Sequence, residues 1–430
     1  MIHKLSLYIG CCLLAGCAAH RAGESVVEPS QVKHIVNTLA ANDMAGRATF
    51  TPGIERAADF ITAEFERIGL TPYSADGYRQ PFHATRVKPT SWEVTINGEA
   101  IPRQNVIVVS NSPGLNWNTE PSVSVRYIPA GADFAQEFRQ AGAGSQDAIV
   151  MVDTSHAEHF AQYAAFLTGG RINPQSGTAE PSVVYVLASG KPESFRVNFT
   201  NTIEQLPLTN LIGVLPGKSK KDEYVIFSAH YDHIGIIEPE GQDSIANGAD
   251  DDASGVSAVL ALADYYKKQA NNERTLLFVT FTGEELGLVG SSYFAKQIDP
   301  DRVAAMINIE MIGKDSPFGP NSLYVTGYDR SDLAGLMQQN VAGTGFTFHP
   351  DPYPDQHLFY RSDNASLAAE GVPAHSFSTV QIDQDKYYHT VKDEVETLDV
   401  ENIVASIRAI ALGASRLVTG QDTPKRVAKR

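Results

Sequence analysis

The chain contains 430 residues, of which 43% are hydrophobic and 9% aromatic, so it is long enough to build more than one domain around a large core. Its formal net charge is −16. So acidic a chain lacks the basic surface that phosphate binding requires, which argues against nucleic acid as a partner. The sequence also contains no glycine-rich phosphate loop and no internal repeat.

The first 16 residues have the pattern of an export signal. Lys4 precedes the apolar stretch 5–14, which is too short to span a bilayer permanently. The next residues, Ala15-Gly16-Cys17, resemble a bacterial lipobox, which implies cleavage before Cys17 and a lipid on its thiol. Residues 17–30 would then be a tether, and Ala18 implies the outer membrane, facing the periplasm or the cell surface. An ordinary secretory signal is the alternative.

The segment 31–90 opens the domain that we expect to carry the function. Residues 54–68 predict a helix, because Ala57, Ile61 and Phe65 recur with helical period and Gly69 follows the last turn. This apolar stripe predicts packing rather than chemistry.

Between residues 91 and 204 the character of the sequence changes. Short strand-like runs at 92–96, 105–109 and 148–152 alternate with clusters of Gly, Pro, Asn and Ser. We expect an inserted β-rich domain here, and none of the candidate metal ligands falls within it.

Beyond residue 205, acidic and histidine residues recur where apolar strands end. The run 224–229 leads into His230-Tyr231-Asp232, the run 275–281 leads to Glu284-Glu285, and the run 304–309 ends at Glu310. Carboxylates at the ends of buried strands are costly unless something there requires them. In open α/β sheets the carboxyl ends of the strands are where ligands bind.

Two further segments add potential ligands. Asp250-Asp251-Asp252 lies between Gly248 and Gly255, directly before an apolar helix at 256–266. Taken alone, this triplet could equally be a solvated loop. His389 follows in a polar, turn-rich segment near the end of the chain. Histidine and carboxylate ligands without cysteine suit zinc or a similar divalent ion.

Taken in order, these motifs resemble metallopeptidase family 28, the co-catalytic zinc aminopeptidases related to bacterial leucyl aminopeptidase. The resemblance covers about residues 30–90 and 205–415 and implies two zinc ions. It implies Glu284 as the general base and Asp232 as the residue that orients the imidazole of the first ligand. The ligands that it implies are His230, Asp251 as the bridge, Glu285, Glu310 and His389.

Two positions depart from the family pattern. Many members have Asp where this chain has Glu310, and the family often has His where this chain has Asn364. The longer Glu310 side chain should still reach a metal, whereas the role of Asn364 stays open. Tyr388 is the candidate donor of a hydrogen bond to the oxyanion; alternatively, it is a partly buried tyrosine of the core. His233 is expected to have a structural role.

The expected fold is a three-layer α/β sandwich with a mixed, largely parallel central sheet, formed by residues 31–90 and 205–420 and interrupted by the insert at 91–204. The resemblance implies a di-zinc exopeptidase acting on peptides, most simply an aminopeptidase. A single-zinc glutaminyl cyclase, a carboxypeptidase and a non-catalytic binding module of the same fold are the alternatives. Oligomeric state and side-chain specificity stay open.

Overall fold

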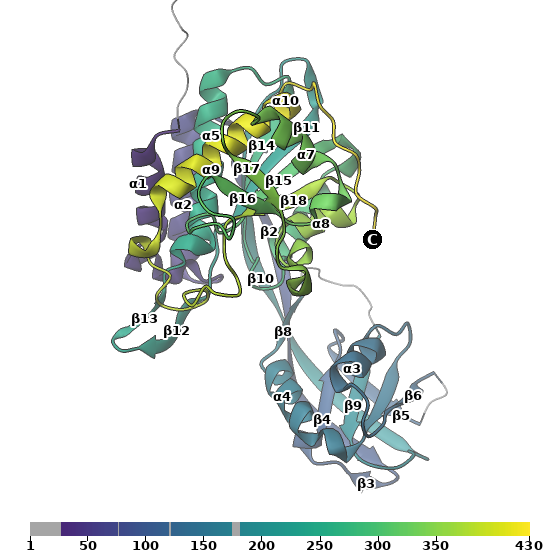
Figure 1. Ribbon diagram of the computed structural model, residues 1–430. Helices are drawn as coiled ribbons and strands as arrows, with labels where there is room; N and C mark the ends of the chain where they lie inside the picture. Colours follow the sequence, from purple (N-terminus) through teal and green to yellow (C-terminus); the bar gives the residue numbers. More distant parts are fainter. Residues whose placement is uncertain (1–26, 76, 120–121, 174–180) are drawn as a thin grey trace, which may run out of the picture.

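The computed structural model describes residues 27–75, 77–119, 122–173 and 181–430 and shows two lobes joined by a pair of long strands (Figure 1). The predicted export signal and Cys17 lie outside the described residues. Val27 is 3% exposed and a helix begins at Pro29, so the last residues of the predicted tether pack on the larger lobe. The end of the predicted tether thus overlaps the start of this helix, while its first residues lie outside the described part of the chain.

One mixed sheet runs through the protein. In chain order its strands are β1 (Thr71–Pro72), β2 (Arg79–Ile96), β3 (Glu99–Ala100), β5 (Gly114–Asn118), β8 (Arg171–Asn173), β10 (Phe195–Leu215), β11 (Lys220–His230), β14 (Arg274–Phe281), β15 (Val303–Ile309), β16 (Ser322–Val325), β17 (Thr347–Pro350) and β18 (Ala374–Ser378). The main path is β17-β16-β18-β15-β11-β14-β10-β2-β3. The four neighbours β18, β15, β11 and β14 are parallel, whereas β16 and β10 flank them in antiparallel pairing.

Helices cover both faces of the parallel strands. One face carries α1 (Pro29–Leu39), α2 (Pro52–Ile68), α5 (Gly255–Gln269), α7 (Leu333–Asn340) and α9 (Val400–Gly413). The other carries α6 (Val289–Gln297) and α8 (Asn364–Ala369), and α10 (Ser415–Val418) follows α9. Side chains alternate between the two cores, since Val225 and Phe227 of β11 join the first and Ile226 joins the second. The predicted three-layer α/β class is confirmed.

The ends of α2 show how local sequence sets the boundaries. The Thr51 side chain accepts a hydrogen bond from the backbone N–H of Gly53 at 3.2 Å, and Pro52 occupies the first turn, where a missing N–H costs nothing. Gly69 ends the helix in the left-handed conformation, with φ of 76°. The buried side chains include Ala57, Ile61 and Phe65, as the helical period predicts.

The smaller lobe contains a second sheet and two helices. Its elements are β4 (Val106–Val109), β6 (Ser124–Ile128), α3 (Phe134–Gly142), β7 (Ala148–Val152), α4 (Ala157–Thr168) and β9 (Val183–Leu187). The sheet order is β4-β9-β7-β6, with α3 and α4 packed on one face and the distal parts of β2 and β10 on the other. The lobe is therefore a layered α/β unit, in which helices supply one whole side of the core.

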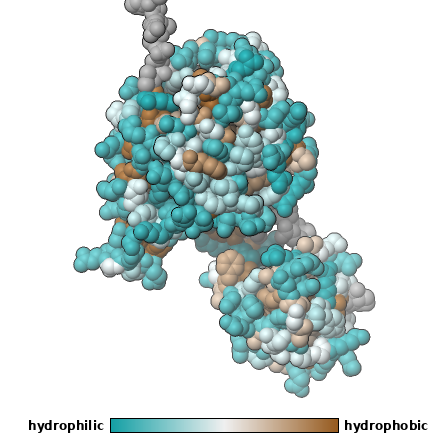
Figure 2. All heavy atoms as spheres, viewed as in Figure 1, coloured by the Kyte–Doolittle hydropathy of each residue, from teal (hydrophilic) through white to brown (hydrophobic). Residues whose placement is uncertain are grey.

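A narrow waist separates the two lobes, and the view of the surface is largely hydrophilic (Figure 2). The hairpin of β12 (Gly235–Glu240) and β13 (Asp243–Ala246) projects from the larger lobe beside α2 (Figure 1). Within the described part of the chain, we find no helix with the length and apolar character needed to cross a membrane.

Candidate metal centre

The ends of three neighbouring parallel strands bring the candidate ligands together. His230 is the last residue of β11, and Glu310 directly follows β15. Glu284 and Glu285 lie in the turn after β14. Because β14, β11 and β15 are adjacent and parallel, their carboxyl ends meet at one edge of the sheet. Asp251 reaches the same edge from the irregular segment 249–254 that precedes α5.

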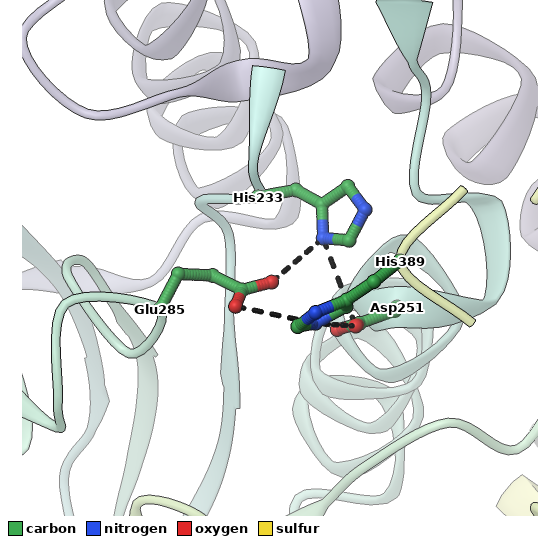
Figure 3. A group of neighbouring side chains, drawn as sticks. All are labelled: His233, Asp251, Glu285 and His389. Carbon is green, nitrogen blue, oxygen red and sulfur yellow. Dashed lines mark hydrogen bonds and ion pairs between the residues drawn. The ribbon is translucent and has the colours of Figure 1, made fainter. Parts of the chain in front are cut away.

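The two carboxylate oxygens of Asp251 face two different groups of side chains. Oδ1 lies 3.1 Å from His230 Nε2, which in turn lies 3.3 Å from Glu310 Oε1. Oδ2 lies 3.3 Å from His389 Nε2, which lies 3.3 Å from Glu285 Oε2 (Figure 3). Asp251 is 2% exposed, so this shared carboxylate is almost completely buried.

The spacing of these atoms fits zinc. Tetrahedral zinc with nitrogen and oxygen ligands at about 2.0–2.2 Å places neighbouring ligand atoms roughly 3.3–3.5 Å apart. The distances from 3.1 to 3.3 Å around Asp251 are close to that separation. The candidate atoms of His230, Asp251 and Glu310 all lie within 4.8 Å of one another, as do those of the second group. Each group can therefore hold a divalent ion.

The electrostatics of the second group also call for a cation. Burial opposes protonation of His389, but its hydrogen bonds with Asp251 and Glu285 outweigh burial and raise its pKa to about 10. Burial raises the pKa of Asp251, but His233 and the hydrogen bonds from His230 and His389 outweigh it and hold that pKa well below its usual range. The carboxylates thus favour protonation of the neighbouring imidazoles. A bound divalent ion would supply this positive charge in place of the protons.

His233 belongs to this second group, although the sequence pattern favoured a structural role. Its Nδ1 lies 2.8 Å from Glu285 Oε1 and 3.7 Å from Asp251 Oδ2 (Figure 3). The structural assignment is wrong because β11 ends at His230, and the chain then turns so that the residue three positions later points back into the site. A second histidine so soon after the His-x-Asp motif was the available signal.

Asp232 acts differently from the expectation. The atom that meets His230 Nδ1 is the backbone carbonyl oxygen of Asp232, at 3.0 Å, whereas the nearer carboxylate oxygen lies 3.8 Å away. The carboxylate instead accepts the backbone N–H groups of Glu284 and Glu285 at 3.2 and 3.4 Å. Asp232 therefore positions both the first histidine and the Glu284–Glu285 turn, but only the second of these through its side chain.

The acidic triplet is not a solvated loop. Asp250 and Asp252 are both completely buried, and both carboxylates hold backbone groups. Asp252 accepts N–H groups at 3.1 to 3.2 Å from His230, Gly255 and Met311, while Asp250 accepts that of Gly313 at 2.7 Å. The two neighbours of Asp251 therefore tie the ends of β11 and β15 to the start of α5.

Arg47 and Asp393 both hold the backbone of the Asp251 segment. Arg47 is completely buried and donates only to backbone carbonyls, at 2.6 to 3.3 Å, namely those of Leu39, Tyr231, Asn247, Gly248 and Asp251. Asp393 accepts the backbone N–H groups of Asp250 and Asp251, each at 3.0 Å to its Oδ2. These contacts fix the backbone from Asn247 to Asp251.

A cavity opens beside the metal ligands. Asp251, Glu284, Glu310 and Tyr388 line its end at the metal centre. The remaining wall mixes hydroxyl and apolar side chains with one arginine: Met311, Tyr324, Thr326, Leu358, Arg361, Ser362, Ser376, Ser378, Val380 and Ile382. A substrate in this cavity would meet Glu284 and Tyr388 at the ligand edge, as the general-base and oxyanion roles require.

The environment of Glu284 suits a proton acceptor. Burial raises its pKa well above the ordinary range; the carboxylates of Glu310 and Asp363 act in the same direction, and His230 opposes them. Burial, followed by the charges of Asp251 and Glu285, also raises the pKa of Tyr388, so its hydroxyl stays protonated and able to donate.

Asn364 does not line the cavity. Its side chain is completely buried, donates to the carbonyls of Phe359 and Ala374 at 3.0 and 3.3 Å, and accepts the hydroxyl of Ser376 at 2.8 Å. It therefore supports a wall residue of the cavity. Glu310 is held by Ser362, whose hydroxyl donates to Oε2 at 2.6 Å. The longer side chain at position 310 thus reaches the site and is fixed there.

Comparison with known proteins finds similar peptidases. Residues 210–413 match the model of Peptidase family M28. A probable leucine aminopeptidase of Trichophyton verrucosum is 32% identical over 218 residues, which cover 49% of this chain and 57% of the relative. Another, of Arthroderma otae, is 29% identical over 236 residues, covering 53% and 60%. The chain thus spans less than two thirds of the length of these curated relatives.

Solved structures show the same fold over nearly the whole chain. An aminopeptidase from Aneurinibacillus sp. strain AM-1 superposes with a TM-score of 0.55 at 18% identity, covering 95% of this chain and 96% of that one. A zinc aminopeptidase from Bacillus subtilis gives a TM-score of 0.56 at 17% identity, covering 93% and 98%. In its segment 210–413, which is less than half of the chain, the protein is thus similar to peptidase family M28.

Proposed function

We propose that this protein is a zinc-dependent aminopeptidase that removes N-terminal residues from peptides, with two zinc ions held on either side of Asp251. The observation that carries the proposal is the shared carboxylate, with Oδ1 at 3.1 Å from His230 and Oδ2 at 3.3 Å from His389. Such a bridge matches the two-ion sites of aminopeptidases, in which the ions lie about 3.5–4 Å apart. His230 and Glu310 would hold one ion, and Glu285 and His389 the other.

The residues around the ions would carry the proton transfers. When bound, zinc supplies Lewis acidity that polarises a peptide carbonyl and makes water a better nucleophile at neutral pH. Glu284 would accept the proton of the attacking water and return it to the leaving amine. Tyr388, on the wall of the same cavity, would donate its hydroxyl hydrogen to the oxyanion.

The test of this mechanism is Glu284→Gln. We expect the variant to fold and to keep its zinc, because Glu284 is not a ligand in this assignment, and to lose several orders of magnitude in turnover, because an amide cannot carry the proton. Glu66→Gln, an exposed change of the same chemistry, should be indistinguishable from wild type. Retention of a tenth or more of the turnover by Glu284→Gln would remove that residue from its role.

Zinc stoichiometry separates the aminopeptidase from a glutaminyl cyclase of the same fold. Each side of Asp251 has its own histidine and its own glutamate, which favours two ions. Near two zinc ions per chain supports the proposal, and near one supports the cyclase. A panel of aminoacyl, dipeptidyl and N-blocked peptides then separates aminopeptidase from carboxypeptidase activity, and a binding module would hydrolyse none of them.

We also propose that the protein is exported and anchored to the outer membrane through a lipid on Cys17. The motive is the Ala15-Gly16-Cys17 pattern after the short apolar stretch. In a Gram-negative host, the wild-type protein should incorporate labelled palmitate and fractionate with the outer membrane. Cys17→Ser should lose the label. Absence of label from the wild type would leave the ordinary secretory signal.

A further inference from the structure

The second ligand group contains His233, Asp251, Glu285 and His389. The proposed function gives a role to each of these residues except His233. His233 is 2% exposed and lies in the loop after β11, and its ring makes a T-shaped contact with that of His389 at a centroid distance of 5.6 Å. The backbone N–H of His233 donates to the carbonyl of Arg47 at 3.3 Å. A Cβ added to Gly248 would lie 2.6 Å from the imidazole ring, so this glycine leaves room for the ring at its position.

The contacts of the ring distinguish its two nitrogens. Nδ1 lies 2.8 Å from Glu285 Oε1, a hydrogen-bond distance. Nε2 is buried and has no hydrogen-bond partner within the described residues. Because Glu285 Oε1 is an acceptor, the tautomer that fits is the one with its proton on Nδ1.

The two oxygens of Glu285 therefore face different partners. Oε1 accepts from His233, while Oε2 lies 3.3 Å from His389 Nε2, at the position shared with Asp251 (Figure 3). A hydrogen bond that fixes Oε1 of Glu285 also fixes the direction of Oε2. Residues that hydrogen-bond to metal ligands commonly orient those ligands in this way. A zinc site used for catalysis keeps one position open, so three protein ligands with a fourth residue behind one of them fit better than four direct ligands.

We propose that His233 is a positioning residue of the metal centre, which donates its Nδ1–H to Glu285 Oε1 and thereby aims Glu285 Oε2 at the ion shared by His389 and Asp251. This inference rests on the proposed two-zinc site. It assigns His233 to one of the two ions only, because its Nδ1 lies near Glu285 and near Oδ2 of Asp251, the oxygen that faces His389.

The test compares His233→Asn with His233→Leu, two side chains of nearly the same shape. The Nδ2–H of asparagine can take the place of the histidine Nδ1–H, whereas leucine offers no donor. Zinc content and competition with a chromophoric chelator report the affinity of each ion without reference to activity. His156→Leu, which replaces another buried histidine in the smaller lobe, is the matched control.

We expect wild type and the His156→Leu control to bind two zinc ions. His233→Leu should weaken one ion about 10–100-fold, the usual effect of removing a group behind a metal ligand, and leave the other unchanged. His233→Asn should stay within a few-fold of wild type. Equal affinity of both ions in His233→Leu would overturn the proposal. Loss of one ion in His233→Asn, with a changed absorption spectrum of the cobalt-substituted protein, would overturn it in favour of direct ligation.

Two further outcomes keep the test decisive. If His233→Leu does not fold, as judged by circular dichroism, His233→Asn alone decides, because positioning predicts retention of both ions and direct ligation predicts loss of one. If wild type itself binds fewer than two zinc ions, the two-zinc function fails, and with it the assignment of His233 to the second ion. Failure of the function and failure of the inference are thus distinguished by the wild-type measurement.

Discussion

Replacing Arg47 with methionine should destabilise the protein strongly, although Arg47 lies more than 150 residues before the matched family segment. The side chain is completely buried, and within the described part of the chain its hydrogen bonds go to five backbone carbonyls. Methionine keeps much of the volume but offers no donor. These five carbonyls would then lose their donor.

The size of the effect follows from these contacts. A buried polar group left unsatisfied costs about 1–3 kcal/mol, and Arg47 satisfies several such groups. Local relaxation and water entry keep the total below the simple sum. We expect a loss of about 4 kcal/mol in the free energy of unfolding, within the 3–5 kcal/mol found when one partner of a buried charged pair is removed. The unfolding free energy of Arg47→Lys should lie between those of wild type and Arg47→Met, because lysine keeps the charge with fewer donors.

Urea unfolding followed by circular dichroism, at fixed free zinc, measures this loss. The matched control is Arg79→Met, because Arg79 pairs with Glu55 and Asp59, whose side chains are 63% and 77% exposed. Such surface ion pairs contribute about 0–1 kcal/mol. A loss from Arg47→Met no larger than that from Arg79→Met would refute the argument that Arg47 holds the Asp251 segment.

Two other predictions concern the acidic triplet and a buried histidine. Asp251→Ala should lose zinc from both positions, so a chelator should not lower its melting temperature further. Asp252→Ala should destabilise even the metal-free protein, because three backbone N–H groups lose their acceptor. Equal behaviour of the two variants would contradict the bridging role. Burial lowers the pKa of His375 to about 4. Below the ordinary histidine pKa of about 6.5 the unfolded chain therefore takes up the proton first, and stability falls with pH through the window from 6.5 to 4. Relative to His375→Gln, metal-free wild type should lose about 2 kcal/mol of unfolding free energy between pH 7 and pH 5, and parallel pH profiles in urea titrations would show that His375 does not titrate in this way.

The parts of the fold that sequence predicts well are those where one interaction dominates. The apolar runs of β11, β14 and β15 can be satisfied only in a buried sheet, and each ends at a residue of the candidate site. His389 and Asp393 are different, because the loop that carries them meets the Asp251 segment through contacts between distant parts of the chain. No local sequence pattern predicts such contacts. For His389, only the family resemblance indicated a role in the site.

The direction of individual side chains was the least predictable property. Asp232 and His233 follow the same strand end, yet the sequence gives no sign that the backbone carbonyl of the first faces His230. Nor does it show that the imidazole of the second faces Glu285. Both depend on the turn that the chain makes after β11. Helix α3 of the smaller lobe was missed for another reason, since such a short amphipathic segment is outweighed by the surrounding turn residues.

The long strands β2 and β10 make the smaller lobe topologically equivalent to the tip of a hairpin. They pair in antiparallel register from Arg79 opposite Leu211 to Ile96 opposite Phe195, so the chain leaves the larger lobe and returns to it at adjacent positions. The chain segment between the paired ends of β2 and β10 forms a closed loop, whatever its length. The entropic cost of closing such a loop rises only slowly with its length. The smaller lobe is therefore a replaceable module. A short turn joining Thr85 to Gln205, which lie opposite each other, would remove most of it without changing the pairing of β10 with β14 beside the metal centre.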